Sequence, residues 1–149
     1  MPEHGSIEIA RLAPADRDPW ERLWKGYMEF YDRVIAPEAY ERAWRLFGED
    51  ATIHALGAKI DGTLVGIVHF LIHPSTSNRD VCYLQDLFTD PEARGRGVAR
   101  ALIHAVAKFA RERDCWRVYW HTHKTNETAR RLYDRVGQNR GFVRYDIDV

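Results

Sequence analysis

A short loop rich in glycine and arginine carries the residues of this 149-residue chain that most directly suggest chemistry. Arg94, Gly95, Arg96 and Gly97 supply two guanidinium groups and two positions without a side chain. Glycines let backbone N–H groups come close to an anion, and guanidinium groups are fixed positive charges. The loop is therefore suited to hold a phosphate, although a plain basic turn between two elements would have the same composition.

The sequence on either side predicts the elements that position this loop. Residues 84–90 alternate between polar and apolar side chains and stop at Asp90-Pro91, as a strand over 81–89 would. After Gly97 the apolar residues recur at a helical period, at Val98, Leu102, Ala105, Val106 and Phe109. The first N–H groups of such a helix have no partner within the helix and lie at the positive end of its dipole.

The whole stretch from Leu84 to Val106 resembles the acetyl-coenzyme A motif of the GNAT N-acetyltransferase superfamily. The family pattern Arg/Gln-x-x-Gly-x-Gly/Ala is matched by residues 94–99, Arg-Gly-Arg-Gly-Val-Ala. The preceding residues 87–92 and the following residues 100–103 are also similar to the family. The resemblance extends more loosely over nearly the whole chain.

The resemblance implies an α/β GNAT fold and acetyl-coenzyme A (acetyl-CoA) as cosubstrate. Backbone groups near Leu87 and Thr89 would hold the pantetheine arm and polarise the thioester carbonyl, and those of residues 94–99 would hold the pyrophosphate. The residues that the resemblance assigns to the cosubstrate are Leu87, Phe88, Thr89, Arg94, Gly95, Arg96, Gly97, Val98, Ala99 and Asn126.

Tyr133 is the candidate general acid. The segment Asn126 to Asp134 resembles the family pattern Asn-x-x-Ala-x-x-x-Tyr, in which the tyrosine reaches the sulfur of the thioester. Asn126, Ala129 and Tyr133 share one face of a predicted helix over 126–136. A tyrosine with an ordinary pKa of about 10 stays neutral and can protonate a leaving thiolate. The alternative is a core tyrosine with Asn126 as a helix cap.

Asp86 is the candidate base. A primary amine has a pKa of about 10.4 and must lose a proton before it attacks. Asp86 lies on the predicted strand that leads into the loop, where it could take that proton directly or through water. Polyamine-type relatives look like Leu-Glu-Asp here, whereas this chain has Leu84-Gln85-Asp86. Gln85 cannot act as a base, so Asp86 or an ordered water remains, and Asp86 could also be a structural carboxylate.

The remaining histidines and cysteines give weaker signals. His121 and His123 point the same way on a strand, but no third ligand lies at a recognisable spacing, so we expect no metal. His121 is also positioned to line the acceptor side. Cys82 and Cys115 open two strands that we expect to be neighbours, and we expect reduced, buried thiols.

Composition limits the possible classes. Hydrophobic residues make up 45% and charged residues 30% of the chain, with a formal net charge of +0. This balance gives no electrostatic reason to expect nucleic acid or an anionic membrane as partner. The N-terminus does not resemble a secretory signal, and no apolar run is long enough to span a bilayer. We expect one domain over residues 1–149 and a cytoplasmic location.

The order of predicted elements is mixed α/β. Strands are expected at 6–12, 52–60, 63–72, 81–89, 116–121 and 142–149. Helices are expected at 19–34, from 36, at 98–114 and at 126–136. Asp61-Gly62 predicts a tight hairpin. Strands 81–89 and 116–121 flank one helix, so they should be parallel. In the GNAT fold these two strands splay apart, and the pantetheine arm lies between them.

The sequence therefore predicts an acetyl-CoA-dependent N-acetyltransferase in which a primary amine attacks the thioester directly. The tail from Leu132 resembles that of polyamine and histone-type acetyltransferases, so a polyamine or a protein lysine is the expected acceptor. An aminoglycoside, an amino acid or a protein N-terminus remains an alternative acceptor, and a non-catalytic acyl-CoA-binding regulator is the rival class. Aromatic residues in the two N-terminal helices could line the acceptor pocket. We also expect a homodimer with an exposed strand edge covered.

Overall fold

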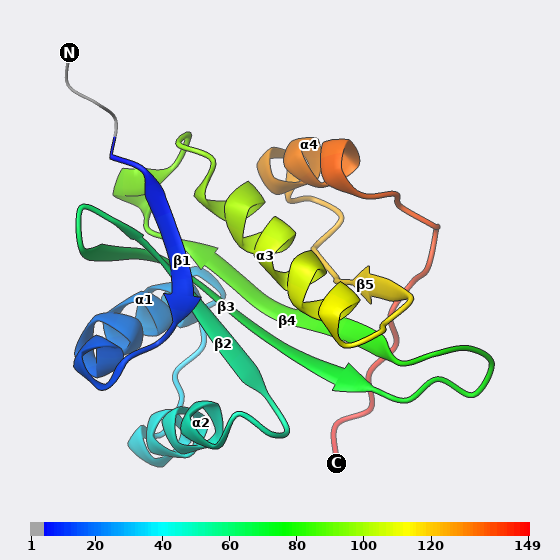
Figure 1. Ribbon diagram of the computed structural model, residues 1–149, viewed down its shortest axis with the longest axis horizontal. Helices are drawn as coiled ribbons and strands as arrows, with labels where there is room; N and C mark the ends of the chain where they lie inside the picture. Colours follow the sequence, from blue (N-terminus) through cyan, green and yellow to red (C-terminus); the bar gives the residue numbers. More distant parts are fainter. Residues whose placement is uncertain (1–4) are drawn as a thin grey trace.

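The computed structural model describes residues 5–149, and in this range five strands form one sheet in the order β1-β2-β3-β4-β5 (Figure 1). The strands are β1 (Ile7–Arg11), β2 (His54–Ile60), β3 (Thr63–His73), β4 (Val81–Thr89) and β5 (Arg117–Tyr119). The α-helices are α1 (Arg17–Phe30), α2 (Pro37–Glu49), α3 (Val98–Glu112) and α4 (Glu127–Val136). Short 3₁₀ turns, η1 (Pro14–Asp16) and η2 (Pro91–Ala93), precede α1 and α3.

Strand pairing follows the order of the chain. Strands β1 to β4 pair antiparallel, and β5 joins β4 in parallel after the α3 crossover. The predicted parallel pair is therefore confirmed. The predicted hairpin is confirmed too, because Asp61 and Gly62 both have positive φ, 50° and 79°, as a tight two-residue turn requires.

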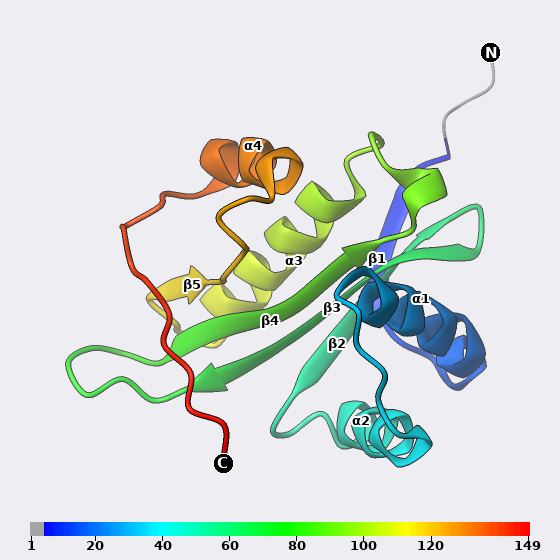
Figure 2. The ribbon, with the colours of Figure 1, turned by 180° about the vertical axis from the view of Figure 1, so that it is seen from behind.

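Two apolar clusters fill the two faces of the sheet. One face carries α3 and α4, and its buried centre includes Val68, Phe70, Leu84, Leu102 and Val106. The other face carries α1 and α2. Figures 1 and 2 show this division from opposite sides. The second cluster contains most of the aromatic residues of the N-terminal helices, around Trp20, Leu23, Tyr40, Phe47 and Ile67. Three of these aromatics, Trp20, Tyr40 and Phe47, are buried core residues.

A bulge in β4 changes the direction of its side chains. His69 pairs with Asp86 and Phe70 pairs with Leu84, so Gln85 is the extra residue on β4. Leu84 packs in the cluster on the α3 face. Strict alternation would place Asp86 on that same face. The bulge instead places Asp86 opposite His69 on the face covered by α1 and α2.

Some predicted boundaries differ from the structure. The first helix covers Arg17–Phe30 rather than 19–34, and β5 is limited to Arg117–Tyr119 rather than 116–121. The predicted closing strand over 142–149 is wrong, because the described chain has no helix or strand after Val136. Its alternating residues remain exposed, with Phe142, Val143, Tyr145, Ile147 and Val149 all largely accessible.

The physical reason is that a strand needs a neighbouring edge. In both views the C-terminal segment runs past β5 and the start of β4 without joining the sheet (Figures 1 and 2). The apolar alternation in this segment is a true β signal, but within one chain it has no hydrogen-bonding partner.

Because α3 lies close to β3, we expect alanine substitutions at two glycines, Gly66 and Gly48, to change the free energy of unfolding in opposite directions. A Cβ at Gly66 would lie 2.6 Å from Cγ1 of Val98 and 3.1 Å from Cδ1 of Leu102. Gly48 lies in α2, and a Cβ there meets nothing within 4 Å. We expect Gly66→Ala to lower the free energy of unfolding by about 1–3 kcal/mol through overpacking. The matched Gly48→Ala should raise it by about 0.5–1 kcal/mol through helix propensity. Urea denaturation of both variants measures this, and equal effects would contradict the packing described.

Candidate active site

Strands β4 and β5, the last two strands of the sheet, diverge after a short parallel pairing. Their parallel pairing covers only Val81–Tyr83 and Arg117–Tyr119, whereas β4 continues to Thr89. Within the described residues, the segment from Leu84 to Thr89 therefore has a strand partner on its β3 side alone. Its other backbone edge is available to a ligand in the manner of an added strand. This geometry confirms the predicted splay.

The glycine-arginine loop forms an open cradle at the start of α3. Gly95 and Gly97 have φ values of 80° and 82°, and a Cβ at either position would meet nothing within 4 Å. Gly97 is the N-cap, and the helical ladder starts with the bond from Ala101 N–H to Gly97 C=O at 3.0 Å. The N–H groups of residues 98–100 thus lack a helical partner, and the first turn contains no acidic side chain. These features fit the pyrophosphate of acetyl-CoA.

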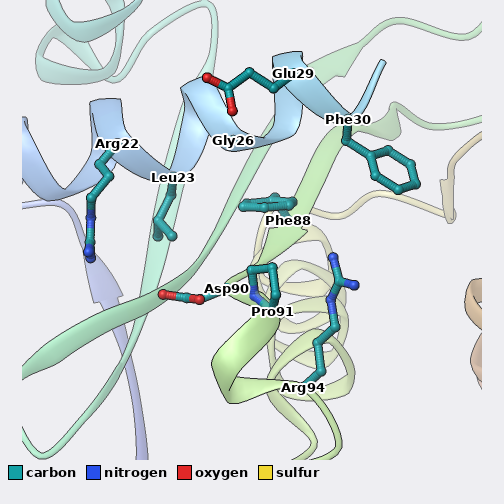
Figure 3. Close-up of a pocket in the computed structure, with 9 residues that line it drawn as sticks. All are labelled: Arg22, Leu23, Gly26, Glu29, Phe30, Phe88, Asp90, Pro91 and Arg94. Atoms are coloured by element: carbon teal, nitrogen blue, oxygen red, sulfur yellow. The ribbon is translucent and has the colours of Figure 1, made fainter. Parts of the chain in front are cut away.

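A pocket of about 340 Å³ joins this loop to α1. Figure 3 shows Phe88 and Pro91 below the helix, with the Arg94 side chain extending toward its C-terminal end. Its full lining is Arg22, Leu23, Gly26, Glu29, Phe30, Phe88, Asp90, Pro91 and Arg94. Nearby, the Thr89 hydroxyl is buried without a hydrogen-bond partner. Two of the predicted cosubstrate residues, Phe88 and Arg94, therefore line one cavity beside the splayed strands.

Asp86 lies in a hydrogen-bonded chain that the sequence analysis missed. Its Oδ2 is 3.0 Å from Nδ1 of His69, and Nε2 of His69 accepts a hydrogen bond from the indole N–H of Trp20 at 3.0 Å. His69 is 2% exposed, whereas the side chain of Asp86 is 16% exposed. Asp86 thus reaches solvent or substrate while its partner does not. The only sequence signal for His69 was a single histidine inside the predicted apolar strand 63–72.

Aromatic residues form a wall next to Asp86. Trp24 and Tyr27 stack with ring centroids 4.9 Å apart, and Tyr27 contacts Tyr31 at 5.0 Å. Tyr31 in turn lies 5.3 Å from the ring of His123. Burial raises the pKa of Tyr27, and the neighbouring charges of Tyr31, Asp86 and Tyr133 raise it further. The wall is therefore close to both candidate catalytic residues and remains uncharged near neutral pH.

Tyr133 lies on α4, with its ring 5.5 Å from that of Trp120 in an edge-to-face contact. Burial raises the pKa of Tyr133, and the nearby Tyr31 raises it too. The phenol is therefore protonated at neutral pH, as a general acid must be. Asn126 is the N-cap of α4 but makes no side-chain capping bond; its amide instead donates to Thr122 Oγ1 at 3.3 Å. The capping alternative for Asn126 is not supported.

The other histidines and cysteines are also located. The ring of His121 lies 3.2 Å from the hydroxyl of Tyr83, on the same sheet face as Asp86. Across residues 5–149 no group of three His, Cys, Asp or Glu side chains is arranged to hold a metal ion. Cys82 and Cys115 are both buried and unpaired. Burial and the neighbouring Cys115 raise the pKa of the Cys82 thiol to about 12.

Comparison with known proteins decides the family. The Acetyltransferase (GNAT) family matches residues 18–138, which is most of the chain. The chain belongs to the GNAT acetyltransferase family. It is an N-acetyltransferase that uses acetyl-CoA. No helix in residues 5–149 has the length and apolar character to cross a membrane.

Two relatives cover nearly the same span as this acetyltransferase. The D-amino-acid N-acetyltransferase HPA3 of Saccharomyces cerevisiae is 33% identical, covering 93% of this chain and 89% of its own. The thialysine N-epsilon-acetyltransferase of Mus musculus is 32% identical, covering 89% and 84%. Both relatives are named for N-acetylation of a small molecule, a D-amino acid in one case and thialysine in the other.

Solved structures show the same architecture. The ribosomal-protein-alanine N-acetyltransferase from Brucella melitensis biovar Abortus 2308 superposes with a TM-score of 0.81 at 29% identity, covering 97% of this chain and all of its own. An aminoglycoside N-acetyltransferase solved with CoA gives a TM-score of 0.86 at 19% identity, covering 99% and 98%. The second likeness establishes the fold alone.

The cradle predicts that Gly97→Val weakens acetyl-CoA binding at least tenfold. The branched side chain would fill the space in which the backbone must approach the pyrophosphate. Isothermal calorimetry measures the affinity. Gly62→Val is the matched control, because Gly62 has a similar φ of 79° and open surroundings but lies in the β2–β3 turn. Both variants carry the same kind of backbone strain. Undiminished affinity in a folded Gly97→Val protein would reject the cradle.

Proposed function

We propose that this acetyltransferase transfers the acetyl group to the primary amine of a small cationic molecule, by direct attack within a ternary complex. The observation that carries the proposal is the partly exposed carboxylate of Asp86 beside an uncharged aromatic wall. Carboxylates and aromatic faces both attract an ammonium group. The wall itself includes Trp24, Tyr27 and Tyr31.

Two side chains, Asp86 and Tyr133, carry the protons in the proposed reaction. Asp86 takes one proton from the ammonium, directly or through a water molecule, and frees the lone pair. The amine nitrogen then forms a bond to the carbonyl carbon of the thioester, and backbone N–H groups near Leu87 and Thr89 stabilise the oxyanion. The C–S bond breaks, and the thiolate takes the phenolic proton of Tyr133. The acetylated nitrogen then loses its extra proton to the phenolate of Tyr133, which leaves a neutral amide and restores the phenol, and the proton on Asp86 passes to solvent. No acetyl-enzyme is formed.

The proposed acceptor is an alkyl ammonium group. A polyamine and a lysine side chain both present an ammonium group on a flexible alkyl chain, which suits a carboxylate next to aromatic rings. The relatives act on D-amino acids and on thialysine, so an amino acid remains a direct competitor, as do an aminoglycoside and a protein N-terminus. A non-catalytic acyl-CoA-binding regulator would bind the cosubstrate without releasing thiol, whatever amine is present.

The test combines an amine panel with Tyr133→Phe. We expect wild-type protein to release CoA thiol with cationic primary amines. Tyr133→Phe should lower kcat by about 10²–10⁴-fold with little change in acetyl-CoA affinity, because the proton is needed in the transition state. The loss should shrink when the leaving thiol is more acidic.

Tyr40→Phe is the matched control, since Tyr40 is a buried tyrosine in the α1–α2 cluster away from the splayed strands. We expect it to retain kcat. If Tyr133→Phe keeps full kcat on the preferred amine, Tyr133 is a core residue and water serves as the general acid.

We also propose a homodimer in which the C-terminal segment pairs with a second copy of the chain. The segment alternates apolar residues with charged ones, and its apolar side chains Val143, Tyr145 and Ile147 are 74%, 90% and 89% exposed. Burying such a stripe as an added strand would satisfy both its backbone and its apolar face.

For the compartment we propose the cytoplasm, because two neighbouring thiols that stay unpaired suit reducing conditions.

The dimer proposal predicts that a change on the apolar stripe separates the copies. Tyr145→Asp combined with Ile147→Asp should shift the mass from light scattering at high micromolar concentration from dimer to monomer. Asp148→Ser changes the opposite side of the same segment and should leave the dimer intact. A monomeric wild type would reject the proposal.

A further inference from the structure

His69 is a buried histidine whose two ring nitrogens are both engaged. Its Nε2 lies 3.0 Å from Nε1 of Trp20 on α1, and its Nδ1 lies 3.0 Å from Oδ2 of Asp86 on β4. Trp20 is 0% and His69 2% exposed, so water does not compete for these contacts. The chain of hydrogen bonds connects the helix of the aromatic wall to the strand that carries the candidate base.

The partners determine where the single proton of His69 lies. An indole N–H can only donate a hydrogen bond, so Nε2 of His69 must be the acceptor. The proton of the neutral ring is therefore on Nδ1, where it donates to the carboxylate of Asp86. A second proton would place two N–H groups against each other at Nε2. Nε2 is consequently already occupied by the indole N–H, so His69 cannot itself serve as the base.

Packing fixes the orientation of this ring. Phe47 of α2 stacks on His69 with centroids 4.6 Å apart, and Trp24 of α1 contacts it edge-on at 4.8 Å. The bulge at Gln85 places Asp86 opposite His69 in the β3–β4 register. The contact occupies Oδ2 and leaves Oδ1 of Asp86 for another partner.

We propose that His69, held by Trp20, is a positioning residue that orients Asp86 so that its second oxygen accepts the proton of the attacking amine. The inference rests on the proposed function and adds two residues to it. A carboxylate that accepts a hydrogen bond in its charged form is both oriented and stabilised as an anion. Loss of the Nδ1–H donor removes this stabilisation of the anion. We therefore expect the acidic limb of the kcat/KM profile to move to higher pH.

The groups around Asp86 include two phenols and a histidine. Tyr27 faces Asp86 from α1 and Tyr83 from β4, and burial raises the pKa of both phenols. His121 lies 3.2 Å from the hydroxyl of Tyr83, and Arg144 of the C-terminal segment also acts on Tyr83. None of these groups changes in His69→Leu, so a shift of the acidic limb between the wild type and His69→Leu reports on Asp86 and His69.

The experiment compares His69→Leu with His69→Asn. His69→Leu removes both ring nitrogens, whereas the amide of His69→Asn can place an N–H near the former Nδ1. We expect His69→Leu to lower kcat/KM about ten- to hundredfold and to move the acidic limb up by about one pH unit, with acetyl-CoA affinity unchanged. His69→Asn should recover most of the rate and the original limb.

His54→Leu is the matched control. His54 is also buried, and its Nδ1 lies 2.5 Å from Oδ1 of Asp50, but this pair is on β2 and at the end of α2. Its loss should reduce stability and leave the pH profile unchanged. An unshifted acidic limb in folded His69→Leu would overturn the positioning role, and so would an equal loss of kcat/KM in His69→Asn.

Nitrogen-15 NMR of the wild-type histidine rings gives a readout that needs no turnover. His69, assigned by its loss in His69→Asn, should be neutral and protonated on Nδ1 from pH 5 to pH 8. In Trp20→Phe, Nε2 loses its donor, and His69 should take a second proton within that range. An Nε2–H tautomer in the wild type would overturn the inference even if every His69 variant failed to fold. Absence of turnover with any amine would overturn the proposed function, and the positioning role with it.

Discussion

The candidate active site depends on strand β4, which pairs with β3 along its length but with β5 over only three residues. That partial pairing leaves the edge of β4 from Leu84 to Thr89 without a strand partner on its β5 side. In the proposed cosubstrate site, the amide groups of the pantetheine arm can complete the ladder there. The same strand leads through η2 into the loop at the start of α3, so both parts of that proposed site lie on one continuous segment.

The second property of β4 is the bulge at Gln85. Because the side-chain period of a strand is two, one inserted residue changes the face of everything beyond it. Leu84 remains in the core under α3, while Asp86 comes to face α1 and α2. The acceptor and the cosubstrate can therefore approach the same strand from different sides, one over a face and one along an edge. A single backbone irregularity thus separates the two substrates' routes.

The sequence predicted the structural elements that depend on local patterns of residues. The strand-loop-helix of residues 84–106 and the Asp61-Gly62 hairpin depend on glycine positions and on apolar periodicity, which neighbours in sequence supply. His69 could not be identified this way, because a histidine within an apolar strand does not reveal its partners 49 and 17 residues away. In the sequence, Gln85 matters because it cannot act as a base. In the structure, its effect is to form the bulge that changes the register of β4 with β3. The false strand over 142–149 had the right pattern, but pattern alone does not determine whether a segment pairs with a sheet edge, and this one runs past β5 without pairing.

The two cysteines have a practical consequence for enzymology. Cys82 is fully buried, and its thiol has a pKa of about 12; burial raises the pKa of the Cys115 thiol as well. The thiolate is the form that attacks disulfide reagents, so the folded protein carries almost none of it at neutral pH. Chromogenic detection of free CoA therefore runs against a low background from the enzyme itself. A rise in that background on heating would report that the two buried thiols have become exposed.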